Sequence, residues 1–239
     1  MQETGTRINK YMSQCGYCSR READRLIEKG EVWINGTLAT MGTKVMPGDT
    51  VMVHHTTITP CQKEYLLAFH KPAGIVCTTS KIDKNNVIDY LNFPDRIYPV
   101  GRLDKDTEGL LLITNDGALA HDLLSPAKHV EKTYYAVIDG VVTEKDVNSF
   151  ENGVDIGEEK LTKPGKLRIL KSEPESKIEL TITEGRFHQV KRMFEAVGKK
   201  VLYLKRISMG PLQLTDDLKP GEYRPLTEEE ITALKIVNK

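Results

Sequence analysis

The sequence predicts an α+β protein with two domains, and two observations support this prediction. The first sixty residues contain two helix signals followed by short strands, whereas the later chain alternates longer strand patterns with single helices. Between these regions, the polar and β-branched segment from His54 to Lys63 contains a proline and is typical of an extended linker. We therefore expect a small α/β domain over residues 1–60. Over residues 61–239 we expect a domain in which helices flank a largely antiparallel, mixed sheet.

Composition places the chain among ordinary globular proteins. Charged residues make up 28% of the 239 residues and hydrophobic residues 39%, and 34 Lys and Arg balance 34 Asp and Glu. The zero net charge argues mildly against nonspecific polyanion binding over the whole surface, but it leaves local basic patches open. Four cysteines are too few for a disulfide framework, no apolar run could span a bilayer, and the N-terminus lacks the apolar core of a secretory signal. We expect a cytoplasmic protein without membrane contact.

Two helices are predicted at the start of the chain. Arg7 to Gln14 places apolar residues at helical spacing, and a second helix begins at the capping box of Ser19 and Glu22 and ends at Gly30. Basic residues recur on both helices, and they form either an ordinary solvated face or a phosphate-contacting face. These residues are Arg7, Lys10, Arg20, Arg21, Arg25 and Lys29.

Short strands follow the two helices, and Val32 to Ile34 leads into an Asn35-Gly36 hairpin turn. The segments RINKYMSQCGYCSRREADRLIEKGEVWING and KVMPGDTV resemble the small RNA-binding domain named after ribosomal protein S4, over roughly residues 5–55. The resemblance implies that the basic helix face binds structured RNA.

Cys15 and Cys18 form a CxxC pair, a spacing that also occurs in redox enzymes and zinc sites. A redox pair of that kind follows a strand, whereas here a helix precedes it. Zinc would need a second pair of ligands, which the isolated Cys61 and Cys77 do not provide. We expect two small residues in a helix–turn–helix, and neither a metal nor a cofactor.

The most informative stretch is IYPVGRLDKDTEGLLLITNDG. Two short apolar strands, Ile97 to Val100 and Leu110 to Thr114, enclose a polar loop with one arginine and three carboxylates. A calcium loop would need a glutamate at its twelfth position, where this sequence has Asn115. A loop held between two buried strands has little freedom, which suits a carboxylate that must be fixed in place. This arginine is Arg102, and the carboxylates are those of Asp104, Asp106 and Glu108.

The remaining elements follow from local patterns. Tyr65 to Phe69 and Ile75 to Thr78 are predicted strands on either side of a turn at Lys71, and Lys177 to Thr183 is a predicted strand with one covered face. Further helices are predicted at Val87 to Leu91, Gly117 to Leu124, Thr143 to Phe150 and after Thr227.

An amphipathic helix is predicted near residue 190, where the apolar residues recur at helical spacing and Gly198 marks the end. Its flanks carry His188, Lys191 and Arg192. The predicted apolar stripe consists of Phe187, Val190, Phe194 and Val197.

Three motifs resemble those of the pseudouridine synthases of the ribosomal small-subunit synthase A type, a family that also includes large-subunit enzymes. The longest is GRLDKDTEGLLLITNDG, and the resemblance implies that Asp104 is the essential catalytic residue. KTY places Tyr134 where the family packs an aromatic ring on the target base. EGRFHQVKRM places Lys191 where a basic residue of the family pairs with the catalytic aspartate. The resemblance covers essentially the whole chain.

The resemblance implies an isomerase that detaches uracil from its ribose, rotates the base and rejoins it through C5, without a cofactor. The expected substrate is 16S rRNA, met within an assembling small subunit by a monomeric enzyme. Arg102, Lys71, His188 and Arg192 are the expected RNA contacts of the catalytic domain. Three alternatives remain open: a large-subunit (23S) rRNA synthase, a non-catalytic rRNA-binding assembly factor, and a thiol oxidoreductase that uses Cys15 and Cys18.

Overall fold

The computed structural model describes residues 5–61, 63–80, 82–125 and 128–237. Contacts group the chain into two compact units. The first unit comprises Met1–Tyr65 together with Phe93–Ile97 and Asn115–Gly117, and the second comprises Leu66–Asn92, Tyr98–Thr114 and Ala118–Lys239. The predicted boundary at residue 60 does not include Phe93–Ile97 and Asn115–Gly117, which belong to the first unit although they lie far from it in the sequence.

The N-terminal unit packs two helices against small sheets. Ser19 caps the second helix as predicted, because its Oγ accepts a hydrogen bond from the Glu22 backbone N–H at 3.2 Å. The core joins both helices to the strands through residues such as Met12, Ala23 and Val51. The elements are β1 (Thr6–Arg7), α1 (Ile8–Gln14), α2 (Arg20–Glu28), β2 (Val32–Ile34), β3 (Thr37–Leu38), β4 (Lys44–Val45), β5 (Val51–Val53) and β6 (Thr56–Ile58).

The expectation of an extended linker from His54 is wrong over β6, which pairs antiparallel with β5. His54 and His55 both have positive φ values, 46° and 65°, and they form the tight turn that folds the chain back. The resulting sheet has the order β3-β2-β5-β6, while β1 pairs with β4 separately.

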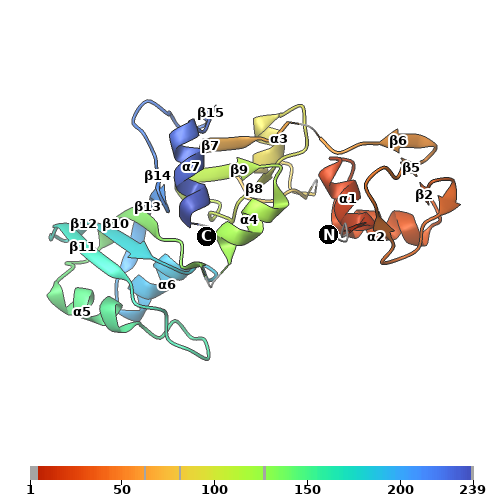
Figure 1. The fold of residues 1–239 in the computed structure, drawn as a ribbon. Coiled ribbons are helices and arrows are strands. Elements are labelled where there is room, and N and C mark those ends of the chain that lie inside the picture. The colour runs from red at the N-terminus through yellow and green to blue at the C-terminus, as the bar shows by residue number, and fades with distance from the viewer. Residues whose placement is uncertain (1–4, 62, 81, 126–127, 238–239) are drawn as a thin grey trace. The chain divides into compact units, whose positions relative to one another are not determined.

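The second unit is built on one nine-stranded sheet (Figure 1). Its main path runs β11-β12-β10-β13-β9-β7-β15, with β14 beside β13 and β8 beside β9. The β13–β9 pair is parallel and the other described pairs are antiparallel, which confirms the predicted mixed, largely antiparallel sheet. The strands are β7 (Leu66–Lys71), β8 (Tyr98–Pro99), β9 (Glu108–Thr114), β10 (Lys132–Asp139), β11 (Lys166–Lys171), β12 (Glu175–Ile182), β13 (Lys200–Met209), β14 (Leu212–Gln213) and β15 (Tyr223–Pro225).

Helices cover both faces of this sheet around β9, which is buried along almost its whole length. Leu110 and Leu112 pack into a core with residues of α4 (Gly117–Leu124) and α7 (Glu228–Val237). On β7, Phe69 contacts Tyr90 of α3 (Val87–Leu91), with ring centroids 5.9 Å apart. A strand between two apolar layers is held rigidly, so the loop that precedes β9 has a fixed base.

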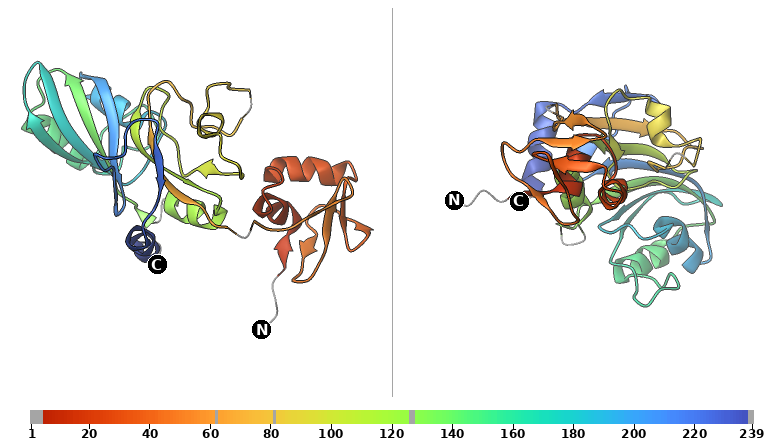
Figure 2. Two further views of the ribbon diagram at one scale, coloured as in Figure 1. Left: turned by 90° about the horizontal axis from the view of Figure 1, so that it is seen from above. Right: turned by 90° about the vertical axis from the view of Figure 1, so that its right-hand side faces the viewer.

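The other end of the sheet carries α5 (Glu144–Asn152) and α6 (Gln189–Ala196), which lie side by side (Figures 1 and 2). Phe150 and Phe194 join the two helices edge to face, with ring centroids 5.0 Å apart.

The α+β architecture predicted from the sequence is confirmed. The predicted strand at Ile75 to Thr78 is wrong, because this segment forms only an isolated bridge between Val76 and Asn86. No helix in the described ranges is long and apolar enough to cross a membrane.

Candidate active site

The loop from Gly101 to Thr107 leaves β8 and enters β9, and its backbone is anchored at several points. The Thr107 N–H donates to the Asp104 carbonyl at 3.1 Å, which closes a turn beneath the Asp104 side chain. The Gly74 N–H donates to the Lys105 carbonyl at 2.7 Å and ties this turn to the segment after β7. These bonds fix the backbone that carries the Asp104 carboxylate.

Lys71 anchors the same loop from inside the protein. Its side chain is fully buried, and its Nζ donates to the carbonyls of Pro72 (2.9 Å), Lys105 (3.2 Å) and Thr107 (2.8 Å). Burial lowers the pKa of this ammonium, although electrostatic interactions with Cys77, Asp106, Asp104 and Glu108 oppose that effect. The expectation that Lys71 contacts RNA is therefore wrong, because a cation without solvent exposure cannot reach a phosphate.

Cys77 supports the loop from a third side. Its buried Sγ accepts a hydrogen bond from the Leu103 N–H at 3.3 Å, one residue before Asp104. Burial raises the pKa of this thiol, so the uncharged form is the one that holds the loop.

Asp104 faces two cationic or potentially cationic side chains from the α6 region. The Lys191 Nζ lies 3.3 Å from Asp104 Oδ2, and the His188 Nε2 lies 3.6 Å from Asp104 Oδ1. The Asp104 side chain keeps 27% of its surface exposed, so a ligand can reach it. Residues separated by more than eighty positions are thus brought together by the packing of α6 beside the loop.

Asp106 shares Lys191 with Asp104 and is its closer partner, with Nζ and Oδ1 2.6 Å apart. The hydrogen bond from Lys191 lowers the pKa of Asp106, and partial burial opposes this only in part. Burial alone would lower the pKa of Lys191, but its hydrogen bond to Asp106 and the two aspartate charges outweigh it and raise that pKa. Lys191 therefore stays a cation beside Asp104 across neutral pH.

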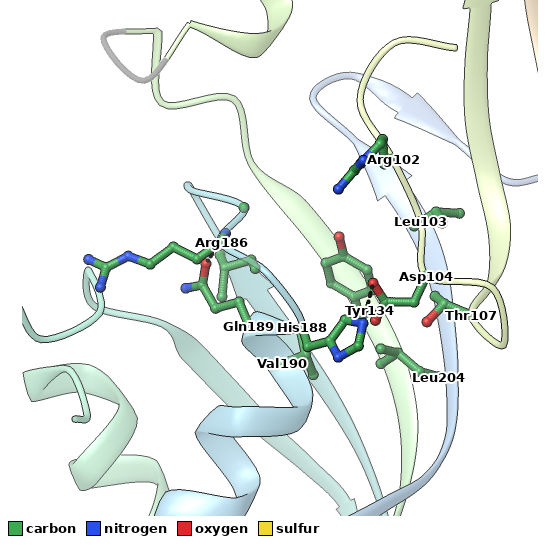
Figure 3. Close-up of a pocket in the computed structure, with 12 residues that line it drawn as sticks. Arg102, Leu103, Asp104, Thr107, Tyr134, Arg186, His188, Gln189, Val190 and Leu204 are labelled. Atoms are coloured by element: carbon green, nitrogen blue, oxygen red, sulfur yellow. Dashed lines mark hydrogen bonds and ion pairs between the residues drawn. The ribbon is translucent and has the colours of Figure 1, made fainter. Parts of the chain in front are cut away.

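A small cavity of about 70 Å³ opens at Asp104, and Tyr134 of β10 lines it together with Leu204 and Ile182 of the neighbouring strands (Figure 3). Figure 3 shows Tyr134, His188 and Asp104 converging there, with the Arg102 side chain reaching in from the loop. Arg102 is exposed and makes no ion pair with the described residues. The cavity adjoins a larger groove of about 600 Å³, and the two share Asp104 and His188.

The turn before α6 is held by its own arginines. Arg186 points away from the cavity and donates to the carbonyls of Lys160 and Leu161, at 2.7 Å each. Arg192 donates to Glu158 Oε1 at 2.6 Å and to the Phe187 carbonyl at 3.0 Å. Arg192, an expected RNA contact, is thus occupied by protein groups that shape this turn.

Phe187 departs from the predicted apolar stripe, since it precedes α6 and its side chain is 68% exposed. His188 adopts a left-handed backbone conformation with φ of 49°, which rotates the chain before the helix begins. Val190 and Phe194 are buried as the stripe predicts.

The predicted RNA-binding cations of the N-terminal unit are all exposed: Arg7, Lys10, Arg20, Arg21, Arg25 and Lys29. Arg25 pairs with Glu22 at 2.9 Å, with both side chains largely in solvent. Such an exposed pair contributes little to stability and leaves the arginine available to a phosphate.

Cys15 and Cys18 are free thiols whose pKa values burial raises to about 11, which makes both poor nucleophiles.

Sequence reasoning missed two supports of the site. The sequence places Asp106 in the polar loop without a role, and it shows Cys77 as an isolated thiol. The GRLDKD spacing could have suggested Asp106, since alternate residues of a tight loop can reach one cation. Nothing in the sequence indicates the Cys77 contact.

Within the described ranges, no group of three or more His, Cys, Asp and Glu side chains is arranged to hold a metal ion.

Comparison with known proteins identifies the family of the chain. The model of the RNA pseudouridylate synthase family matches residues 65–196, and the S4 domain model matches residues 6–51. The chain is 43% identical to the RNA pseudouridine synthase YtzG of Bacillus subtilis, over 95% of this chain and 98% of that protein. It is 39% identical to the dual-specificity RNA pseudouridine synthase RluF of Escherichia coli, over 97% of this chain and 79% of that protein.

The ribosomal small subunit pseudouridine synthase A of Yersinia pestis is also 39% identical, over 95% of this chain and 97% of that protein. A crystal structure of a pseudouridylate synthase matches with a TM-score of 0.70 and 36% identity, over 96% of this chain and 99% of that one. The chain therefore belongs to the RNA pseudouridylate synthase family, whose members are intramolecular isomerases that act on RNA.

Proposed function

We propose that this enzyme converts a specific uridine of small-subunit (16S) ribosomal RNA to pseudouridine, with Asp104 as the catalytic carboxylate. One observation carries the assignment of the residue. Asp104 is an accessible carboxylate at the mouth of a cavity lined by Tyr134, and Lys191 lies 3.3 Å away. A carboxylate held in place beside the Lys191 cation and the Tyr134 ring suits chemistry on a ribose whose base stacks on that ring.

The reaction breaks the bond between ribose C1′ and uracil N1 and forms a bond between C1′ and C5. The proton on C5 leaves and N1 gains one, so atoms and electrons balance without an oxidant, a reductant or water. Asp104 either attacks C1′ or removes a neighbouring ribose proton, and both routes require the ionised carboxylate. Tyr134 keeps the loose base stacked, because its ring lines the cavity, and the low exposure of that ring helps to exclude water.

The target uridine has to leave its stack before it can reach Asp104. Turning a base out of folded RNA costs about a few kcal/mol, and least in loops and bulges. Arg102 is the group best placed to offset this cost, because it is exposed beside the cavity and has no ion-pair partner among the described residues. It would hold a phosphate next to the extruded nucleotide, while His188 faces the same carboxylate.

The N-terminal unit would dock the enzyme on folded RNA through its exposed cations. Each phosphate contact that is lost should reduce the salt dependence of binding by about 0.7–0.9 in log–log slope. Substituting Arg20, Arg21 and Lys29 together with Gln in the full chain should therefore flatten the salt slope for rRNA. The matched control removes the exposed Lys145 of the catalytic domain. An unchanged slope in the triple variant would count against docking by this helix.

The proposal of small-subunit RNA is supported by the ribosomal small subunit pseudouridine synthase A of Yersinia pestis, which is 39% identical to this chain. RluF is equally identical and is named for dual specificity, so an enzyme that also modifies other RNA is the second candidate. Either substrate would use the same cavity.

The test is to map pseudouridine in both ribosomal RNAs from a strain that lacks this gene. Loss of one site in the small-subunit RNA, restored by the wild-type gene and not by Asp104→Asn, is the expected result. A lost site in the large-subunit RNA alone would overturn the substrate assignment. Treating naked 16S RNA and assembling particles from the deletion strain with the purified enzyme then shows which form is the substrate.

A further inference from the structure

An aromatic pair stands at the edge of the active site. The rings of Phe187 and His188 stack with centroids 3.8 Å apart and planes inclined by 18°. Phe187 is 68% exposed, while His188 reaches Asp104 at 3.6 Å. One face of Phe187 is therefore covered by a ring that touches the catalytic carboxylate. The exposure of the side chain leaves aromatic surface open beside the site.

The backbone beneath this pair is held in place. Arg192 donates to the Phe187 carbonyl, and Arg186 is anchored on the carbonyls of Lys160 and Leu161. The Arg186 N–H also donates to Gln189 Oε1 at 2.9 Å. A large apolar ring exposed on a mobile loop would order only on binding, but here the loop is already ordered, so a ligand meets a preformed surface.

The surface belongs to the larger groove beside the catalytic cavity. Phe187 and His188, which precede α6, line this groove. Its other lining residues include Arg102, Asp104 and Lys105 of the loop before β9, and Asp83. Arg102 and Lys105 are offset by Asp83 and Asp104, and Arg186, which also lines the groove, pairs with Glu158 and Glu184. The groove therefore carries little net positive charge, and the exposed ring of Phe187 in it favours base stacking.

We infer that Phe187 is a stacking platform for an unpaired nucleobase that flanks the target uridine in the substrate RNA. This inference rests on the proposed function, because it places the RNA strand across Asp104. When the target base enters the cavity at Tyr134, the neighbouring nucleotide has lost its stacking partner. Phe187 replaces that partner, at the end of the groove that is continuous with the cavity through Asp104 and His188.

Stacking on an aromatic side chain accepts every base, so the platform selects for an unpaired strand and not for a sequence. A stacked base contributes about five- to one-hundred-fold to affinity. An apolar side chain without a ring can cover the same groove but cannot stack. The platform therefore predicts a ranking in which Tyr replaces Phe187 and Leu does not.

The binding test uses fluorescein-labelled octauridylate and full-length protein carrying Asp104→Asn, measured by fluorescence anisotropy. In this background we expect Phe187→Ala and Phe187→Leu to weaken binding by about five- to one-hundred-fold, and Phe187→Tyr to stay within about twofold. The control is Tyr223→Ala, which removes an exposed aromatic ring from β15, outside the groove. A ribose–phosphate strand of the same length without bases should bind all these variants equally.

Binding of octauridylate by Phe187→Ala within twofold of the parent would overturn the platform. An equal loss on the base-free strand, or no binding of octauridylate by the parent, would also overturn it. Tritium release from C5-labelled small-subunit RNA by the wild-type enzyme tests the proposed function separately. An inactive wild type that binds octauridylate through Phe187 keeps the platform and refutes the substrate. An active wild type with an unchanged KM in Phe187→Ala refutes the platform and keeps the substrate.

Discussion

Lys71→Met is the substitution that separates a structural role of this lysine from RNA binding. Methionine matches the length of the buried stem but donates no hydrogen bond. The Pro72 and Thr107 carbonyls then lose the Nζ donor, whereas the Lys105 carbonyl keeps the Gly74 N–H at 2.7 Å. The loop that presents Asp104 therefore loses its bonds from Lys71 at Lys105 and Thr107.

The magnitude follows from the Pro72 and Thr107 carbonyls. A buried acceptor left without a partner costs about 1–3 kcal/mol, so the loss is about 2–6 kcal/mol. Removing the ammonium also removes its desolvation penalty, the same burial that lowers the pKa of Lys71 in the folded protein. We expect a net loss of about 2–4 kcal/mol in the free energy of unfolding. A displacement of Asp104 by about 1 Å would lower kcat by about a hundredfold.

Urea unfolding should be followed by far-ultraviolet circular dichroism. The single tryptophan, Trp33, lies in the N-terminal unit and would not report on the catalytic sheet. Saturating tritium-release assays give kcat, and KM should change less than kcat because Lys71 touches no RNA. Lys145→Met removes an exposed lysine from α5 and serves as the matched control. A Lys71→Met enzyme with kcat within threefold and stability within about 0.5 kcal/mol of the wild type would refute the anchoring role.

Three further predictions follow from the same unit. Gly109→Ala should lose at least about 2 kcal/mol of stability in urea, because the added Cβ would lie 2.2 Å from a β13 carbonyl oxygen. The control is Gly157→Ala, whose Cβ would have no atom within 4 Å and which should lose about 1 kcal/mol. Burial lowers the pKa of Lys132 to about 8, so the unfolded chain holds more protons above that pH. Wild-type stability relative to Lys132→Met should thus rise by up to about 3 kcal/mol between pH 8 and 10.5, and a flat difference would contradict the shift. Asp106→Asn should move the alkaline limb of the kcat profile to lower pH, because Asp106 helps to raise the pKa of Lys191; an unmoved limb would show that Lys191 does not set it.

Much of the fold follows from short-range signals in the sequence. The capping boxes at Ser19 and Thr227 predict helices that the structure contains, and alternating or apolar runs predict most strands. The failures have local causes. The sequence pattern after His54 predicts a linker, because it does not show that two consecutive histidines adopt positive φ and return the chain as a hairpin.

Asp104 could be proposed as the catalytic residue from the sequence because its motif is long, but its surroundings depend on contacts between distant segments. The sequence alone suggests an RNA contact at Lys71, and only the sheet register shows that this lysine is buried beneath the loop. The helical spacing from Val190 predicts that Phe187 belongs to the apolar stripe. The helix starts after His188, so this spacing does not apply.

The central claim is that the Asp104 carboxylate performs the chemistry, and tritium release by Asp104→Asn tests it most directly. The amide keeps the shape of the side chain and the turn closed by the Thr107 N–H, but it removes the charge. Single-turnover measurements with excess enzyme and C5-labelled rRNA should show no tritium release above background, with RNA binding retained. Release at the wild-type rate would contradict the claim.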